Sequence, residues 1–398
     1  INRESWFNAS WVDELKVKVS YGSQGNDNIS NFLYRDSYSM VNDGTDNWAI
    51  KFITKGNENI TWETNANFNI GAEFGFFGNR LVGSLDYFYR KTSDMLSQYS
   101  VPSSLGYSYY WMNVGDMSNQ GLELELNGTV FRKKNFSWDI NLNITYVKNK
   151  IISLSDNNAT ETYYTKSGKA YTGYRDGSKF FGIGLPIYTM LLKSYAGVDK
   201  ETGEPLYYVR NDDGSLSTTT DYSDKASYFL FDTSLPDVYG GFGTTFNFYG
   251  FDLGINFVYQ IGGKVYDSGY AAAMSSPTSN SSGYALHKDI LKSWTPENPN
   301  SNLPRFQLDD EYTAASSDRF MTSASYLSLQ NINFGYTFPA KWMSKAGISK
   351  LRIYLACENV WLWSKRQGLD PRQSYSGGSS TAYYSPIRTI SGGINVTF

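Results

Sequence analysis

The sequence predicts an all-β fold. We expect a transmembrane antiparallel β-barrel, of which residues 1–398 supply the C-terminal half, roughly eleven of about 22 strands. Many segments of about ten residues alternate apolar and polar side chains, which is the period of a β-strand. No run of about 18 apolar residues exists, so a membrane-spanning helix is excluded and only a barrel could span. Long polar connections also alternate with tight turns, as they do at the two ends of a membrane barrel.

The alternation is clearest in two segments. In residues 136–147, the even-numbered positions are Phe, Trp, Ile, Leu, Ile and Tyr, whereas the odd-numbered positions up to 145 are polar. In Phe251–Ile261 the odd-numbered residues are apolar or aromatic and face away from Asp252, Asn256 and Gln260. The other segments with this pattern are Leu15–Tyr21, Ala66–Phe76, Leu81–Tyr89, Leu122–Leu126, Val238–Phe248, Leu351–Asn359 and Ile390–Phe398, with a weaker one at Gly182–Ala196.

One predicted strand, Tyr326–Phe338, changes its parity. Leu327 and Leu329 share one face, whereas Ile332 and Phe334 share the other. An extra residue in a strand produces such a change, so we expect a β-bulge near Gln330.

Alternation alone also fits a soluble β-sandwich. Three features favour a membrane barrel instead, the first being aromatic residues such as Phe136 and Tyr146 at the ends of apolar faces. The second is the contrast between long and short connections. The third is a C-terminal apolar alternation that ends on Phe398 and resembles the assembly signal of bacterial outer-membrane proteins. For the second feature, the long connections are Asn149–Ser178 and Gly263–Met321, and the short ones are Arg132–Asn135 and Tyr249–Gly250.

The composition excludes several other classes of protein. Charged residues are 18% and aromatic residues 17% of the chain, against about 25% charged residues in an average soluble protein. The net charge is −3 and no basic stripe is present, which excludes a nucleic-acid partner. One cysteine, Cys357, and one histidine, His287, cannot form a disulfide framework or a Cys/His zinc site. We expect no metal and no cofactor.

We also expect the natural protein to extend upstream. The chain starts at Ile1 without a methionine or a signal-peptide pattern. Roughly eleven strands is an odd number, whereas bacterial single-chain barrels have even numbers, so further strands should precede Ile1.

Several blocks of the sequence resemble SusC/RagA-like TonB-dependent outer-membrane transporters. The longest is NENITWETNANFNIGAEFGFFGNRLVGSLDYFYRKTSDML, which covers two predicted strands. The others follow in order along nearly the whole chain: NVGDMSNQGLELELNG, YAGVDKETGEPLYY, LPDVYGGFGTTFNFYGFDL, SWTPENPNSNLPRF, SYLSLQNINFGYTFP and ENVWLWSKRQGLDP. One departure is Arg372, which stands where the family pattern would have a glutamate.

The resemblance implies a location and partners. It places the chain in the bacterial outer membrane, as the barrel of a transporter that imports glycan oligosaccharides or peptides and catalyses no reaction. It also implies a plug and a segment that contacts the TonB–ExbB–ExbD complex, both outside residues 1–398. A SusD-like surface lipoprotein would cover the barrel, and the likeness allows a dimer of such transporter–lipoprotein pairs within outer-membrane lipid.

The candidate substrate-binding residues are four aromatic side chains crowded into a predicted loop: Tyr107, Tyr109, Tyr110 and Trp111. Sugar faces stack on aromatic rings, and ligand pockets favour aromatic walls. The alternative is an interfacial belt or packing within the loop. Trp361 and Trp363 carry the same two interpretations.

Other constellations favour structural interpretations. Glu123 and Glu125 share a strand face, and we expect them to line the polar lumen of the barrel and not to act as the carboxylate pair of a glycosidase. His287 lacks the GxSxG elbow of a triad, and Asp309, Asp310 and Glu311 lack the EF-hand spacing for calcium. The GGFGTTF segment at 240–246 and the glycosylation-like sites at Asn143 and Asn395 lie inside predicted strands. No catalytic residue is expected.

Two rival functions share some of these features. A passive porin-like channel would share the barrel but would need neither a plug nor TonB. A soluble all-β carbohydrate-binding or hydrolytic module would pack its apolar faces sheet against sheet.

Overall fold

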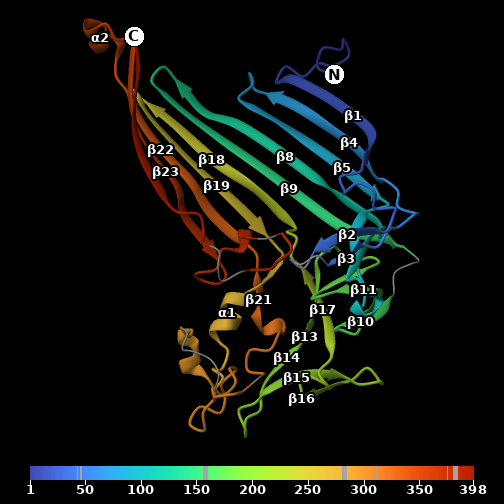
Figure 1. The fold of residues 1–398 in the computed structure, drawn as a ribbon. Helices are drawn as coiled ribbons and strands as arrows, with labels where there is room; N and C mark the ends of the chain where they lie inside the picture. Colours follow the sequence, from blue (N-terminus) through green and yellow to red (C-terminus); the bar gives the residue numbers. More distant parts are fainter. Residues whose placement is uncertain are drawn as a thin grey trace.

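The computed structural model describes residues 1–42, 44, 47–155, 160–279, 285–310, 312–373, 375–379 and 384–398. In this part of the chain, ten long strands form one antiparallel sheet whose neighbours follow chain order (Figure 1). Such an up-and-down order is typical of barrel walls. The ten are β1 (Val12–Asn26), β4 (Glu63–Phe76), β5 (Leu81–Ser93), β8 (Gly115–Lys133), β9 (Phe136–Leu154), β18 (Val238–Phe248), β19 (Phe251–Ile261), β22 (Tyr326–Thr337), β23 (Lys350–Ser364) and β24 (Thr389–Thr397).

Ten of the predicted strands are present in this sheet, and two of them have the predicted bounds. Strands β18 and β19 end where their alternation ends, and Tyr249 and Gly250 join them with φ angles of 47° and 94°. Two consecutive positive φ angles match the right-handed twist of a tight hairpin, which is why glycine suits the second position. The sheet therefore has its tight turns where the sequence predicts them.

The predicted β-bulge at Gln330 is confirmed. On one side of β22, Asn331 pairs with Asn256 and Leu329 pairs with Phe257, so two consecutive residues of β19 face three of β22. The pairing with β23 also shifts here, but there the extra residue lies in β23, since Leu329 pairs with Trp361 and Asn331 with Glu358. The extra residue of β22, Gln330, places the apolar residues on both sides of it on one face of the sheet.

The apolar face of this sheet is largely exposed. Val19 is 62%, Leu355 58% and Ile394 64% exposed, although all three are in regular strands. A β-sandwich would bury such side chains against a second sheet. The exposure excludes the packing expected of a soluble sandwich in the described part of the chain.

The remaining strands and most of the helical elements lie at the end of the sheet opposite to the two termini (Figure 1). Five short strands close into a small barrel, and shorter sheets surround it. The small barrel contains β10 (Glu161–Thr165), β11 (Ala170–Asp176), β12 (Lys179–Gly182), β13 (Thr189–Lys193) and β17 (Tyr228–Thr233). The other short strands are β2 (Ser37–Asn42), β3 (Trp48–Thr54), β6 (Leu96–Ser100), β7 (Tyr109–Asn113), β14 (Tyr195–Val198), β15 (Pro205–Arg210), β16 (Leu216–Thr219), β20 (Lys264–Tyr266) and β21 (Met321–Ser323).

Three expectations need correction here. The segment Gly182–Ala196 is not a strand of the large sheet, because β13 pairs with β12 and β17 in the small barrel, which leaves ten strands in place of roughly eleven. The predicted long loop Asn149–Ser178 begins later, since β9 continues to Leu154, and it contains β10 and β11. Gly263–Met321 contains β20 and several helical turns.

Small apolar clusters hold this end together. In the small barrel Phe180, Leu191 and Leu230 are buried and in contact. Beside it, Ala271, Met274 and Phe320 form a second cluster. These clusters pack the short strands and helical turns together at this end of the sheet.

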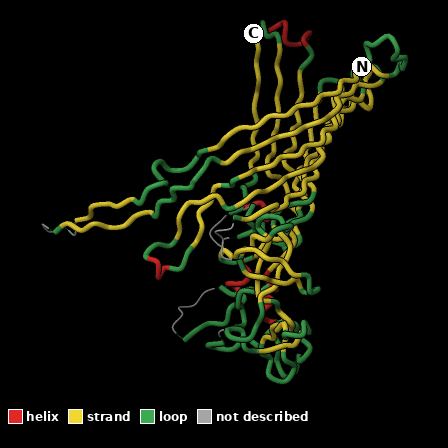
Figure 2. The backbone as a smooth tube through the Cα atoms, turned by 90° about the vertical axis from the view of Figure 1, so that its right-hand side faces the viewer, coloured by secondary structure: helices red, strands yellow, loops and turns green. Residues whose placement is uncertain are grey.

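Helical elements are short. They are α1 (Ser268–Ala273) and α2 (Ala340–Met343), with 3-10 turns η1 (Ser103–Leu105), η2 (Lys288–Lys292), η3 (Asp318–Phe320), η4 (Ser344–Ala346) and η5 (Pro371–Gln373). None of the helices in the described ranges is long and apolar enough to cross a membrane. Figure 2 shows two hairpins, β2–β3 and β6–β7, projecting sideways from the sheet, and α2 beyond the strand ends near the C-terminus.

Deletion of Gln330 should prevent formation of a folded barrel. Without the bulge residue, one half of β22 would present its apolar side chains to the polar face, because a one-residue slip reverses every side chain. Heat-modifiable gel mobility of the full-length protein would report the loss of the folded form. Gln330→Ala keeps the spacing and should fold; folding of the deletion variant to the same extent would contradict this account.

Candidate functional site

The second face of the sheet is mostly polar, with a few apolar residues such as Val147 and Val258. Cross-strand pairing aligns its side chains in rows, one of which runs from Lys18 through Asp86, Glu123, Tyr239 and Gln260. The alternation of each strand therefore adds up to one continuous polar surface and one continuous apolar surface.

Charged groups lie at one side of the polar face. Lys18 Nζ lies 3.2 Å from Glu73 Oε1 and 3.2 Å from Asp86 Oδ1, and Lys16 Nζ lies 3.0 Å from Glu73 Oε2. Gly71 is required below this network, since a Cβ there would lie 2.1 Å from Asp86 Oδ1.

The middle of the polar face is lined by amides and glycines. Asn143 Oδ1 accepts a hydrogen bond from the Gly241 N–H at 2.8 Å, and Asn256 Nδ2 donates to Asn331 Oδ1 at 2.9 Å. A Cβ at Gly243 would lie 2.1 Å from Asn256 Oδ1, so glycine lets the amides lie flat across the strands. These amides can both donate and accept hydrogen bonds, and Glu125 lies beside them as the cross-strand neighbour of Asn143.

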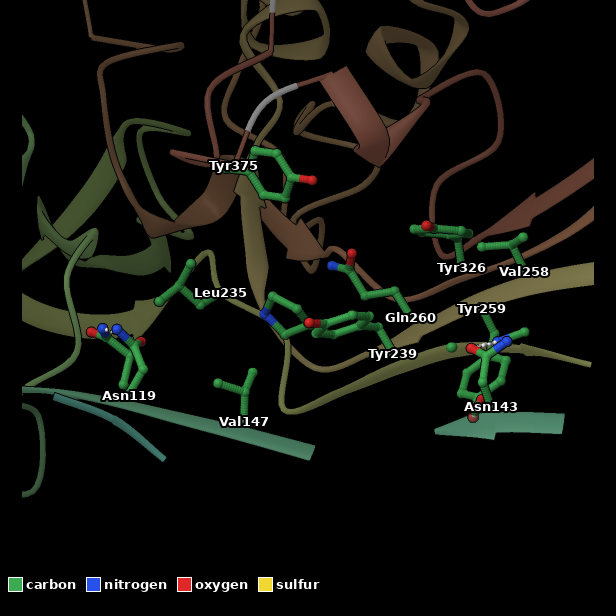
Figure 3. Close-up of a pocket in the computed structure, with 14 residues that line it drawn as sticks. Asn119, Asn143, Val147, Leu235, Tyr239, Val258, Tyr259, Gln260, Tyr326 and Tyr375 are labelled. Atoms are coloured by element: carbon green, nitrogen blue, oxygen red, sulfur yellow. Dashed lines mark hydrogen bonds between the residues drawn. The ribbon is translucent and has the colours of Figure 1, made fainter. Parts of the chain in front are cut away.

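A cavity of about 530 Å³ lies where this amide surface meets the loop elements (Figure 3). Figure 3 shows Tyr239 and Gln260 in the space between the strands and the loop that carries Tyr375. The lining contains no Asp, Glu, Lys, Arg or His: it is Asn119, Asn143, Val147, Asn149, Leu235, Pro236, Tyr239, Gly240, Gly241, Val258, Tyr259, Gln260, Tyr326 and Tyr375.

The loops are attached to this cavity by specific hydrogen bonds. Asn149 Nδ2 donates to Asn119 Oδ1 at 2.8 Å, and its Oδ1 accepts from the Ile187 N–H at 2.8 Å. Ser234 Oγ donates to the Tyr375 carbonyl, which holds that loop over the opening. In the described ranges, the hydroxyls of Tyr239, Tyr326 and Tyr375 have no hydrogen-bond partner, so they are available to a ligand.

Three of the four predicted aromatic candidates lie in a strand, whereas Tyr107 lies in the connection between β6 and β7. Tyr109, Tyr110 and Trp111 belong to β7, so alternation places Tyr110 on the opposite side from Tyr109 and Trp111. Tyr110 packs against Tyr107 and Tyr99, with ring centroids 6.3 and 6.1 Å apart. Burial raises the pKa of the Tyr110 hydroxyl. The structure therefore brings Tyr107 and Tyr110 together and separates them from Tyr109, which is 42% exposed.

The two tryptophans of β23 lie on the apolar face. Trp361 pairs with Leu329 and Trp363 with Leu327, and Leu327 follows the apolar row through Tyr259. Their exposure, 47% and 53%, fits an interfacial aromatic belt and not the polar cavity.

Most of the rejected constellations have structural contacts. His287 Nδ1 accepts from the Asp289 N–H at 3.1 Å at the start of η2. Asp310 pairs with Arg305 at 2.9 Å, whereas Glu311 lies outside the described residues. Residues 240–246, Asn143 and Asn395 lie in strands β18, β9 and β24 as predicted. Within the described ranges, no group of three His, Cys, Asp or Glu side chains could hold a metal ion.

Arg372, the departure from the family pattern, binds a neighbouring carboxylate. Its guanidinium donates to Asp370 through Nε at 2.8 Å and Nη2 at 2.6 Å, and Asp370 is only 2% exposed. Burial alone would raise the pKa of Asp370, but the hydrogen bonds and charge of Arg372 bring that pKa below its ordinary value of 3.8. The arginine thus stabilises a buried carboxylate in the loop after β23.

Comparison with known proteins identifies the sheet. The family described as "TonB dependent receptor-like, beta-barrel" matches residues 7–360. The chain belongs to this family. Its apolar face is the lipid-facing wall of an outer-membrane β-barrel, and its polar face lines the lumen. The short turns mark the periplasmic end, and the loop elements mark the extracellular end.

Individual relatives agree with this assignment. The chain is 28% identical to TonB-dependent receptor P26 of Formosa agariphila over 98% of this chain and 40% of the relative. It is 25% identical to TonB-dependent receptor SusC of Bacteroides thetaiotaomicron, over 90% of this chain and 35% of SusC. Its fold matches the RagAB peptide transporter structure with a TM-score of 0.84 and 26% identity, covering 100% of this chain and 42% of that chain. The chain thus spans about two fifths of these relatives.

The lumen cavity escaped sequence analysis because its residues come from five strands and two separate loops. Tyr239, Gln260 and Tyr326 are direct cross-strand neighbours, although 87 positions separate the first from the last. A periodic pattern places each on the polar face but does not say which strands are adjacent.

Arg372→Glu should loosen the loop after β23. The variant leaves the buried carboxylate of Asp370 without its cation, and breaking a buried pair costs about 3–5 kcal/mol. Hydrogen exchange of residues 364–373 in the full-length protein would measure the loss. Arg132→Glu is the matched control, because its partner lies 3.6 Å away, the arginine side chain is 70% exposed, and such pairs contribute at most about 1 kcal/mol.

The same pair predicts a pH dependence. Because folding lowers the pKa of Asp370, its stabilisation is present above the ordinary value of 3.8 and is lost as the pH falls through the lowered pKa. Protection of this loop should therefore persist at pH 5 to 8 and decline only in stronger acid. A loop already unprotected at neutral pH would contradict the role assigned to Arg372.

Proposed function

We propose that this chain is barrel wall from an outer-membrane importer of glycan oligosaccharides that takes energy from the TonB–ExbB–ExbD complex. The observation that supports a glycan is the uncharged lumen cavity of amides and tyrosines. Sugars present hydroxyl groups that pair with amides, and flat faces that pack on aromatic rings. A peptide, the substrate named for the RagAB neighbours, would also bring charged termini or side chains.

The proposal assigns roles to parts outside residues 1–398. A plug and a TonB-contacting segment elsewhere in the protein would gate the lumen, whereas the 398 residues supply only barrel and loops. A SusD-like lipoprotein would cover the extracellular end, and two such pairs would form a dimer. The projecting β2–β3 hairpin supports a partner there, because Met40 and Ile50 are 71% and 75% exposed on it.

The β6–β7 hairpin provides a second proposed contact with substrate. Tyr109 and Trp111 retain the sugar-stacking role, whereas Tyr107 and Tyr110 hold the hairpin through ring contacts. Tyr109→Ala should weaken binding, and Tyr110→Ala should instead loosen the hairpin.

Substitution in the cavity should weaken binding of glycans. Tyr239→Ala in the full-length transporter with its lipoprotein should lower affinity by about three- to tenfold, the contribution of one aromatic contact. Titration calorimetry with neutral oligosaccharides of several backbone types and with mixed peptides would measure it. Tyr249→Ala is the matched control, because Tyr249 lies on the same hairpin at the opposite end.

The outcomes separate the alternatives. Binding of peptides and not of oligosaccharides would overturn the glycan assignment but leave import in place. Uptake that is unchanged when tonB is deleted would overturn active import and favour a passive channel.

A further inference from the structure

The turn between β22 and β23 is unlike the other turns at the periplasmic end. Strands β8 and β9 are joined by residues 134–135, and β18 and β19 by residues 249–250. The β22–β23 connection runs from Phe338 to Ser349 and contains α2 and η4. Figure 1 shows α2 beyond the strand ends, beside the C-terminus.

This helical turn has a defined conformation. Gly347 adopts a φ of 70°, its N–H donates to the Ser344 carbonyl at 3.2 Å, and the Ile348 N–H donates to the Met343 carbonyl at 3.2 Å. These two bonds form the Schellman arrangement that ends a helix. The Ser349 N–H also donates to the Thr397 carbonyl at 2.7 Å, which attaches the turn to β24.

The side chains of the turn divide into two groups. Met343 and Ile348 are half-buried against the strand ends, whereas Lys341, Trp342, Lys345 and Lys350 are exposed. Trp342 is 60% exposed and has no ring contact in the described part of the chain. The turn therefore presents one indole and the ammonium groups of Lys341 and Lys345 outward, whereas Lys350 begins β23 and shares the polar face with Arg352.

None of these charges is compensated. Residues 338–351 contain no Asp or Glu, and no described carboxylate lies within ion-pair distance of Lys341, Lys345 or Lys350. By contrast, the next cation along β23, Arg352, pairs with Asp252 through Nε at 3.0 Å. Lys341 and Lys345 are thus two cations of the turn without an ion-pair partner in the described chain.

The turn continues the lipid-facing surface. Directly before it, Phe338 and Tyr336 are in ring contact at 4.9 Å, and Tyr336 contacts Phe251 at 4.5 Å. Such aromatic groups mark the level of the lipid headgroups in outer-membrane barrels. Tryptophan prefers this interface, and lysine stems extend toward anionic headgroups from it.

We propose that the α2–η4 turn is an anchor that binds anionic phospholipid of the periplasmic leaflet. Trp342 inserts at the glycerol level, and Lys341 and Lys345 contact the phosphates. The turn would thereby fix the height of β22–β24 in the bilayer. This inference depends on the outer-membrane location and is independent of the transported substrate.

Quenching by brominated lipids tests the position of Trp342. The full-length protein would be reconstituted into nanodiscs of phosphatidylglycerol with bromine near the glycerol or deep in the acyl chain. The fluorescence difference between wild type and Trp342→Phe isolates this indole from the other tryptophans. Shallow bromine should quench it more strongly than deep bromine; quenching by aqueous iodide alone would overturn the proposal.

Lipid retention tests the lysines. In native mass spectrometry, the variant with Lys341 and Lys345 changed to Gln should retain phosphatidylglycerol about fivefold less per lysine, and phosphatidylcholine equally. The matched control changes Lys225 and Lys288 to Gln at the extracellular end. Equal losses in both variants, or none in the first, would overturn the charge contact. Heat-modifiable gel mobility would verify that all variants are folded.

Discussion

The backbone hydrogen bonds of the ten-stranded sheet are the constraint on which the rest of this structure depends. In hydrocarbon, an unpaired N–H or carbonyl costs several kcal/mol, so each strand must pair along its full length. Antiparallel pairing with tight turns satisfies this need and fixes neighbour order. It also fixes the faces, because a side-chain period of two sends alternate residues to lipid and to lumen. The bulge at Gln330 satisfies the same constraint, because one extra residue keeps the apolar side chains of Leu329 and Phe334 on the same face of the sheet.

The lumen wall and the loops use different interactions. On the wall, glycines such as Gly71 and Gly243 let polar side chains lie flat and pair across strands. In the loops, small apolar clusters and buried ion pairs stabilise the structure. Phe180 belongs to such a cluster in the small barrel, and Asp370 and Arg372 form such a pair after β23. The cavity with Tyr239 and Tyr375 forms where these two systems meet, and its uncharged lining follows from the amides of the wall.

The connections at the two ends of the sheet differ in length and in structure. At the extracellular end, the long connections contain short sheets and projecting hairpins. These segments are therefore folded, whereas the sequence predicted polar loops there. At the periplasmic end, two turns have two residues and the β4–β5 turn has four, whereas the β22–β23 connection has twelve and contains α2 and η4. Belonging to the TonB-dependent receptor family explains the barrel, but it does not by itself explain these local differences.

The sequence by itself determined the alternation, and with it the strands, the bulge and the tight turn at Tyr249–Gly250. These features depend on the nearest neighbours in the chain, so the pattern of side chains is sufficient. Only the tertiary structure paired β13 of the segment Gly182–Ala196 with β17 in the small barrel, and assembled the cavity from five strands. Each of these depends on pairing between residues distant in sequence. Local periodicity carries no information about that pairing.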